Sequence, residues 1–211
     1  MGNHINKILH AAPLNFKSTT HDKTIYRTVY KGETIYLLRQ VDDFAFACND
    51  EATAIEIYDI IGKQLRLPNE NKDPFTYLGL VKDFNGIDVE QSKEYIQISC
   101  VNYIDHVITS HGWNNEKTMQ PLSKPRSPLS TESLNQLPKH EGYKEGTKEH
   151  AELEAKSGFS YRILLGEMIY AYVTCRPDIG YAITLMSKFG SSPSPFHYKC
   201  LKDIARYLRT T

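Results

Sequence analysis

The stretch from Thr34 to Cys48 places two short apolar runs on either side of adjacent carboxylates, Asp42 and Asp43. The runs, residues 36–38 and 44–47, are rich in residue types that favour extended backbone. Two runs of this length separated by a few polar residues are typical of a strand, a tight turn and a returning strand. The aspartate pair is therefore predicted at the tip of a β-hairpin.

Two interpretations of the aspartate pair follow from the residues alone. Adjacent carboxylates repel each other, so keeping both ionised requires solvent, hydrogen bonds or a cation. Aspartate is common in turns because it bonds to nearby backbone, and a solvated turn is the simpler interpretation. A divalent cation is the other interpretation, since Mg²⁺ takes one or two carboxylates and leaves its remaining positions to water and substrate phosphates.

Composition narrows the class of protein. The chain has 211 residues, 40% hydrophobic and 24% charged, which is ordinary for a globular protein of one sizeable domain or two small ones. Its 25 basic and 25 acidic residues cancel, so any nucleic-acid contact must depend on local patches. Four widely spaced cysteines fit a reduced intracellular compartment. Without a long apolar run or a signal-peptide core, we expect a soluble protein that is neither secreted nor bound to a membrane.

Periodicity predicts a mixed α+β fold. Apolar residues at helical spacing predict short helices near the N-terminus, after Asp50, and from about residue 102 to Gly112. Extended segments are predicted at residues 24–30, 34–36, 44–48, 75–81, 87–91 and 95–99.

The second half changes character twice. Residues 114–150 carry several prolines and no sustained periodicity, which predicts a linker or a loosely packed loop. Three apolar stripes then predict helices at 161–176, 179–186 and 197–209. We therefore predict three parts, residues 1–113, 114–150 and 151–211.

The final predicted helix carries a basic stripe. Lys199, Lys202, Arg206 and Arg209 are spaced by three, four and three residues, which places them on one face. Such a face is a candidate surface for contacting phosphates. Such a stripe is more often the solvated side of an amphipathic helix, and the spacing alone does not establish phosphate contact.

Six segments together resemble a known family. They are Gln40-Val-Asp-Asp43, Phe75-Thr-Tyr-Leu-Gly79, Tyr95 to Ile104, Tyr161 to Tyr170, Thr174 to Tyr181 and His197 to Leu208. In this order they resemble the reverse transcriptase region of copia-type retrotransposon polyproteins. The resemblance implies a truncated palm, an antiparallel sheet with packed helices, followed by a helical thumb or connection part that ends before ribonuclease H.

The resemblance also implies roles for particular residues. Asp42 and Asp43 would be the palm carboxylates that hold Mg²⁺, or Mn²⁺, in two-metal nucleotidyl transfer. Gln40 stands where the family usually has a tyrosine near the primer, and Tyr77, Leu78 and Gly79 match the segment that supports the primer end. The basic stripe would hold duplex through its phosphates. The implied partners are an RNA template, a DNA primer, deoxynucleoside triphosphates and the remainder of the polyprotein.

Departures from the family pattern limit the expected activity. The strand with a third metal-binding aspartate, the fingers and the ribonuclease H domain are not found in this sequence. We therefore expect a fragment of an RNA-directed DNA polymerase that is inactive alone, located in cytoplasmic virus-like particles or in the nucleus. The alternatives are a non-catalytic nucleic-acid-binding or assembly remnant of the element, and an unrelated α+β domain with a solvated Asp-Asp turn.

Overall fold

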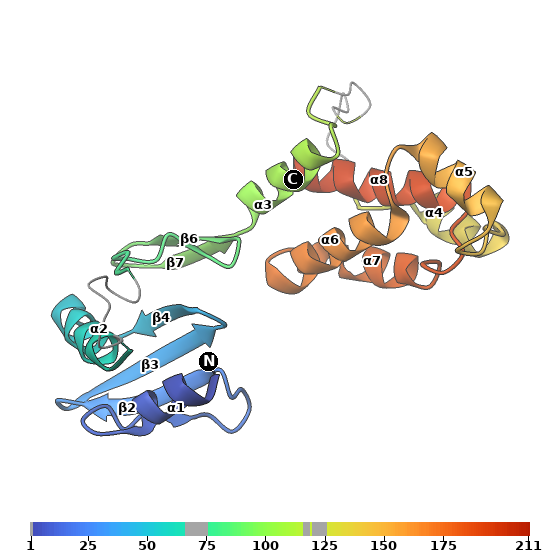
Figure 1. Ribbon diagram of the computed structural model, residues 1–211. Helices are drawn as coiled ribbons and strands as arrows, with labels where there is room; N and C mark the ends of the chain where they lie inside the picture. Colours follow the sequence, from blue (N-terminus) through green and yellow to red (C-terminus); the bar gives the residue numbers. More distant parts are fainter. Residues whose placement is uncertain (1, 66–75, 116–118, 120–125) are drawn as a thin grey trace. The chain divides into compact units, whose positions relative to one another are not determined.

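The computed structural model describes residues 2–65, 76–115, 119 and 126–211 (Figure 1). Its contacts divide the chain into two compact units, Met1–Asn85 and Gly86–Thr211. This division differs from the expected boundary near residue 113. The hairpin and helix of residues 87–110 belong to the second unit, because that helix contributes buried residues to the core of the C-terminal helices.

The first unit contains a four-stranded antiparallel sheet. Its strands, in the order β1-β2-β3-β4, are β1 (Lys17–Ser18), β2 (Ile25–Tyr30), β3 (Glu33–Gln40) and β4 (Asp43–Ala47). The three strands predicted around the aspartate pair are confirmed. β2 and β3 join at Lys31 and Gly32, which have φ of +49° and +83°, a left-handed conformation that glycine adopts easily.

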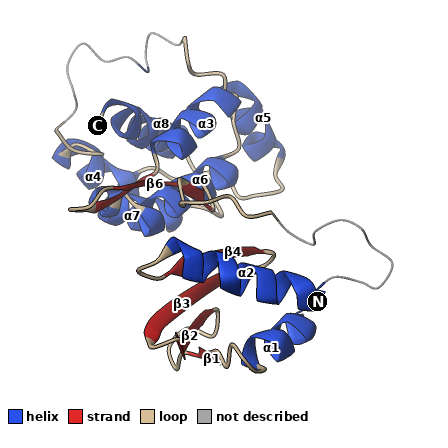
Figure 2. Cartoon of the chain, turned by 90° about the vertical axis from the view of Figure 1, so that its left-hand side faces the viewer, coloured by secondary structure: helices blue, strands red, loops and turns tan. Residues whose placement is uncertain are grey.

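One face of this sheet is covered by two helices, α1 (Gly2–His10) and α2 (Glu51–Leu65) (Figure 2). The helix predicted after Asp50 is confirmed as α2, and the Asp50 carboxylate caps it by accepting a hydrogen bond from the Thr53 amide at 3.0 Å. Alternate residues of each strand face this core, as a half-buried sheet requires. The buried residues shared by helices and sheet are Ile5, Ile8, Leu9, Leu14, Phe16, Tyr26, Tyr30, Ile35, Leu37, Ile57 and Ile61.

The opposite face of the sheet is open to solvent. Val29 and Tyr36, whose side chains point away from the helices, are 60% and 45% exposed. Neighbouring β3 and β4 residues on the same face are half-buried or exposed. The unit is thus a two-layer structure in which one sheet face is available for contact.

The strand predicted at residues 75–81 is not formed in its described part, residues 76–81; Phe75 lies outside the described residues. Gly79 has φ of +76°, which interrupts an extended run, and Leu78 is 88% exposed. Tyr77 packs on α2 instead, with its hydroxyl 3.2 Å from Glu51 and its ring against Tyr58. Residues 76–81 pair with no strand, and the apolar pattern of the sequence does not show whether a segment pairs. The two-residue β5 (Asp83–Phe84) ends the unit.

The second unit begins with the predicted hairpin and helix, both confirmed. β6 (Ile87–Gln91) pairs antiparallel with β7 (Ile96–Ser99), and α3 (Val101–Ser110) follows. Gly112, with φ of +70°, ends α3 as predicted. The predicted C-terminal helices are α6 (Tyr161–Thr174), α7 (Gly180–Ser187) and α8 (Pro195–Thr210), with the short turn η3 (Pro177–Ile179) between the first two.

The predicted linker is more ordered than expected in its described part. It contains α4 (Thr131–Gln136), η2 (Leu137–Lys139) and the start of α5 (Lys148–Ser157). Met119, Leu129 and Leu137 are buried in the same core as α3, α6, α7 and α8. Single apolar residues between prolines give no helical or strand periodicity in the sequence. They are buried because the folded chain turns back and places them against the core.

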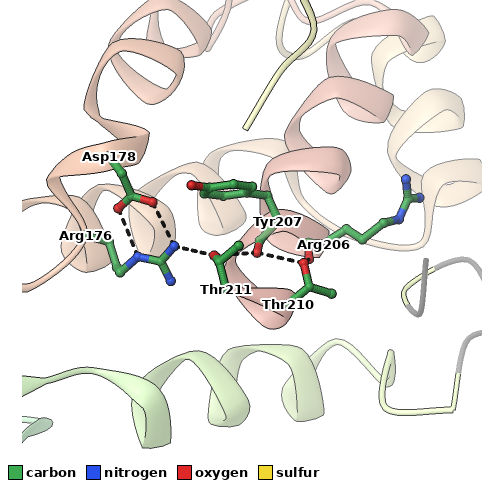
Figure 3. A network of polar contacts seen from close by, with 6 residues as sticks. All are labelled: Arg176, Asp178, Arg206, Tyr207, Thr210 and Thr211. Carbon is green, nitrogen blue, oxygen red and sulfur yellow. Dashed lines mark hydrogen bonds and ion pairs between the residues drawn. The ribbon is translucent and has the colours of Figure 1, made fainter. Parts of the chain in front are cut away.

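A polar network closes the C-terminal end of this unit (Figure 3). The Arg176 guanidinium donates two hydrogen bonds to Asp178, at 3.0 and 2.8 Å, and a third to the hydroxyl of Thr211. It also lies over the ring of Tyr207 in α8. Arg176 therefore fastens the end of α6 to the last turn of α8. Within the described ranges, no helix is both long and apolar enough to cross a bilayer.

Candidate functional site

The aspartate pair lies at a hairpin tip, as predicted. β3 ends at Gln40 and β4 begins at Asp43, so Val41 and Asp42 form the connecting turn and Gln40 pairs with Asp43. Both aspartates are exposed. Water can therefore solvate both carboxylates, and both are accessible to a cation.

The strand register places Gln40 and Asp43 on the open face of the sheet. The same face carries a cross-strand row in which Lys17 opposes Arg27 and Arg27 opposes Tyr36. These three side chains are exposed, and no described residue forms an ion pair with Lys17 or Arg27. Tyr36 lies four residues before Gln40 on β3, or about 13 Å along an extended strand. Two cations and an aromatic ring thus share a surface with one of the two aspartates.

Sequence reasoning missed this row. The alternation of β2 could have indicated that Arg27 points away from the core, since Tyr26 and Thr28 flank it. No pattern within one strand gives the register between strands. Only the pairing of β1, β2 and β3 brings Lys17, Arg27 and Tyr36 together.

The donor set fits a hard divalent cation in part. Two carboxylates are oxygen ligands of the kind that Mg²⁺ prefers, and Mg²⁺ usually keeps several waters. Among the residues with described positions, no group of three or more His, Cys, Asp or Glu side chains could hold a metal ion. Asp42 and Asp43 could therefore supply carboxylate ligands, with the remaining positions filled from water or from other groups.

The segment predicted to support a primer end is placed in a loop. Tyr77 contacts the first turns of α2 rather than pairing with β3 or β4. Leu78 is exposed, and Gly79 has a left-handed backbone with open space where a Cβ would lie. The structure shows no contact of these three residues with the aspartate pair.

The basic stripe of α8 is largely engaged within the protein. Lys199 and Arg206 both form ion pairs with Asp203, at 3.0 and 2.8 Å. The Lys202 ammonium lies 4.9 Å from the centre of the Trp113 ring. The guanidinium of Arg209 donates to the carbonyls of Trp113 and Asn114. Of the four, Lys199 is the exposed one, so these contacts favour a bracing role, and phosphate contact stays a prediction.

Comparisons with known proteins give relatives along nearly the whole chain. A putative transposon Ty5-1 protein of Saccharomyces cerevisiae is 30% identical over 200 residues, which cover 94% of this chain and 53% of that protein. The retrovirus-related Pol polyprotein from transposon TNT 1-94 of Nicotiana tabacum is 27% identical, covering 92% of this chain and 14% of the polyprotein. The corresponding polyprotein from transposon RE1 of Arabidopsis thaliana is 26% identical, covering 94% and 12%.

No family model matches the sequence, and no solved structure matches it. The relatives nevertheless define the class: the chain is retroelement-derived and corresponds to a segment of a transposon Pol protein. Within that class it belongs to the copia-type retrotransposon polyproteins, as its sequence motifs indicated. It spans about half the length of the yeast relative and about an eighth of the two plant polyproteins.

Proposed function

We propose that this chain carries the aspartate hairpin of an RNA-directed DNA polymerase palm, and that Asp42 and Asp43 bind divalent metal there. The observation that carries the proposal is that two adjacent, exposed carboxylates lie at the tight turn between β3 and β4. Two helices pack on one face of the sheet to which these strands belong. A rigid hairpin suits metal binding because the ligands are held by the fold. Membership in the copia-type polyproteins supports this assignment.

Bound Mg²⁺ would activate a primer hydroxyl and neutralise the departing pyrophosphate. The chain's own residues would position that chemistry. Asp42 and Asp43 would provide carboxylate oxygens, and Gln40 would lie beside them toward the primer. Lys17 and Arg27, on the same sheet face, would contact backbone phosphates, while Tyr36 offers a ring on which a base can stack.

We propose further that the purified chain does not extend a primer. Two-metal transfer needs both ions in a fixed relation to the reacting groups, and small displacements cost orders of magnitude in rate. In the described residues the aspartate pair has no third His, Cys, Asp or Glu beside it. Template-dependent incorporation by the chain that disappears in Asp42→Asn would contradict this proposal.

The alternative is nucleic-acid binding without metal catalysis. The specific observation in its favour is the row of Lys17, Arg27 and Tyr36 on an open sheet face, which requires no metal to attract a polynucleotide. Metal binding and nucleic-acid binding can be measured separately, so the two functions can be distinguished.

The metal test is the affinity for Mn²⁺, followed by electron paramagnetic resonance of free Mn²⁺. We expect Asp42→Asn and Asp43→Asn each to weaken binding at least tenfold, because each removes a charged ligand. Asp59→Asn is the matched control, since Asp59 is an exposed carboxylate on α2 and not part of the turn. Equal Mn²⁺ binding by all four proteins would reject the metal site.

The nucleic-acid test is binding of an RNA–DNA duplex, measured by fluorescence anisotropy over a range of salt concentrations. Replacing Lys17 and Arg27 by alanine removes two cations without breaking an ion pair in the described structure. We expect weaker binding and a salt dependence reduced by about two phosphate contacts. The Lys199→Ala/Arg206→Ala variant tests the α8 stripe in the same assay. If only this second variant weakens binding, the nucleic-acid-binding surface is the α8 stripe and not the row of Lys17 and Arg27.

A further inference from the structure

The turn that carries Asp42 has an unusual backbone. Val41, its first residue, has φ of +55°. Left-handed conformations are uncommon outside glycine, and a β-branched residue is a clear outlier there because its side chain crowds the backbone. Val41 is also 73% exposed, so burial of its side chain does not offset the strain.

Among the described residues with positive φ, Val41 is the one with a β-branched side chain. The β2–β3 turn uses Lys31 and Gly32, and the turn after β5 uses Asn85 and Gly86, each pair with positive φ. Glycine and asparagine adopt this region at low cost. Strained backbone persists only where the surroundings hold it, and it concentrates at functional sites.

The structure shows what holds the Val41 turn. The Arg39 guanidinium donates from Nε to the carbonyl of Val41 at 3.2 Å and from Nη1 to the side-chain carbonyl of Asn6 at 3.2 Å. The hydroxyl of Tyr26 donates to the same Asn6 oxygen at 2.7 Å. A chain of hydrogen bonds thus runs from β2 through α1 and Arg39 to the turn.

These hydrogen bonds of Arg39, Asn6 and Tyr26, called the brace below, lie on the sheet face opposite to the proposed nucleic-acid surface. Arg39 pairs with Phe44 on the side of the sheet that α1 and α2 cover, whereas Asp43 pairs with Gln40 on the open side. The guanidinium therefore contacts the turn from behind, through a main-chain oxygen. Its planar group can donate in two directions at once, which a lysine ammonium on a flexible stem does less well.

We propose that Arg39 and Asn6 are positioning residues that hold the Val41–Asp42 turn in its strained conformation, and so fix the direction of the two carboxylates toward metal. The inference rests on the proposed metal site at Asp42 and Asp43. Neither residue touches the metal in this scheme. Residues that orient ligands from behind change metal affinity by about 10- to 100-fold when they are removed.

The test is the Mn²⁺ affinity of Arg39→Ala and Asn6→Ala, with folding checked by circular dichroism. The sign of the Arg39→Ala effect is decisive. Removing a positive charge near two carboxylates should strengthen cation binding if only electrostatics acts. The brace predicts the opposite, about tenfold weaker binding. Asn6→Ala changes no charge and should weaken binding in the same direction, while Lys23→Ala, an exposed cation of the same unit, should not weaken it.

A substitution at Val41 shows whether Mn²⁺ affinity depends on the strained side chain of Val41 or on the hydrogen bonds of Arg39. Asparagine tolerates positive φ, so Val41→Asn should keep the turn and its Mn²⁺ affinity while relieving the crowding of the β-branched side chain. Val41→Asn/Arg39→Ala should be as weak a binder as Arg39→Ala alone.

Unchanged or tighter binding in Arg39→Ala and Asn6→Ala, together with loss of binding in Asp42→Asn, would overturn the inference and leave the metal site standing. Unchanged binding in Asp42→Asn would overturn the metal site and the inference with it. If Arg39→Ala does not fold, Asn6→Ala decides, because it removes the guanidinium's second partner without removing the contact to Val41.

Discussion

The guanidinium of Arg209 donates a hydrogen bond to the main-chain carbonyl of Trp113 at 2.9 Å, across 96 residues of chain. A second nitrogen reaches the carbonyl of Asn114 at 2.8 Å. The last turn of α8 is thereby fastened to the residues that follow α3. A cation predicted from sequence as a phosphate contact is engaged in a structural contact.

We predict that Arg209→Ala lowers the free energy of unfolding of the second unit by about 1–3 kcal/mol, because the part-buried carbonyl of Trp113 and the exposed carbonyl of Asn114 lose a charged donor. Urea unfolding followed by fluorescence measures this directly, since Trp113 is the single tryptophan of the chain and is buried in that unit. Lys199→Ala on the same helix removes an exposed charge and should change stability by no more than about 0.5 kcal/mol. Equal effects of the two would contradict the bracing role.

We predict that the protein loses stability in mild acid because of the buried side chain of His197. Its ring is fully buried, with Nδ1 accepting from the Ser194 amide and Nε2 donating to the Leu137 carbonyl at 2.9 Å. Burial lowers the pKa of His197 below its usual value of 6.5. Below about pH 6.5 the unfolded chain therefore binds a proton that the folded chain does not, and the free energy of unfolding falls as the pH falls.

The measurement is urea unfolding at several pH values between 8 and 5. His197→Gln should be less stable at pH 8, because the fit of the ring against Phe189 is lost, yet its stability should depend less on pH. An identical pH dependence in both proteins would show that His197 does not titrate on unfolding.

We predict that substitution by alanine changes stability in opposite directions at Gly142 and Gly166. A Cβ at Gly142 would collide with the carbonyl oxygen of Ser192. Next to it, the amides of Tyr143 and Glu145 donate hydrogen bonds to the carbonyls of Pro193 and Ser191, which hold the two backbones close together. Gly142→Ala should therefore destabilise the second unit by about 1–3 kcal/mol. Gly166 lies inside α6 with open space around its missing Cβ, so Gly166→Ala should stabilise by about 0.5–1 kcal/mol. Thermal unfolding of both variants checks the pair, and destabilisation of similar size in both would refute the argument.

Two arginine–carboxylate pairs should differ in their tolerance of lysine. Arg176 is 17% exposed and bonds Asp178, Thr211 and the face of Tyr207, whereas Arg162 is 65% exposed and bonds Glu145. A lysine cannot reproduce a planar, two-pronged contact. Arg176→Lys should cost about 1–2 kcal/mol of unfolding free energy and Arg162→Lys less than about 0.5 kcal/mol, because water screens the exposed pair. Chemical denaturation of both variants measures the difference, and an equal loss would argue against the network of Figure 3.

Local patterns decided most of the secondary structure. The apolar runs around Asp42 and Asp43 gave a hairpin, and the stripes around Ile57, Ile104 and Leu201 gave α2, α3 and α8. These predictions succeed because amphipathic periods of two and 3.6 residues are written in consecutive residues. The exposure of the aspartate pair at a turn follows from the same pattern.

The sequence by itself therefore determined the elements, the family motifs and the position of the two carboxylates. Only the tertiary structure decided which segments pair or pack with each other and which side chains come into contact. Residues 76–81 of the strand predicted at 75–81 pair with no strand, and Leu129 and Leu137 of the expected linker are buried in the core. The row of Lys17, Arg27 and Tyr36 arises from strand register, and the contacts of Arg39 with Asn6 and of Arg209 with Trp113 join residues far apart in the chain. The physical reason is that hydrogen bonds and packing between distant segments depend on how the chain returns to itself, which no local period encodes.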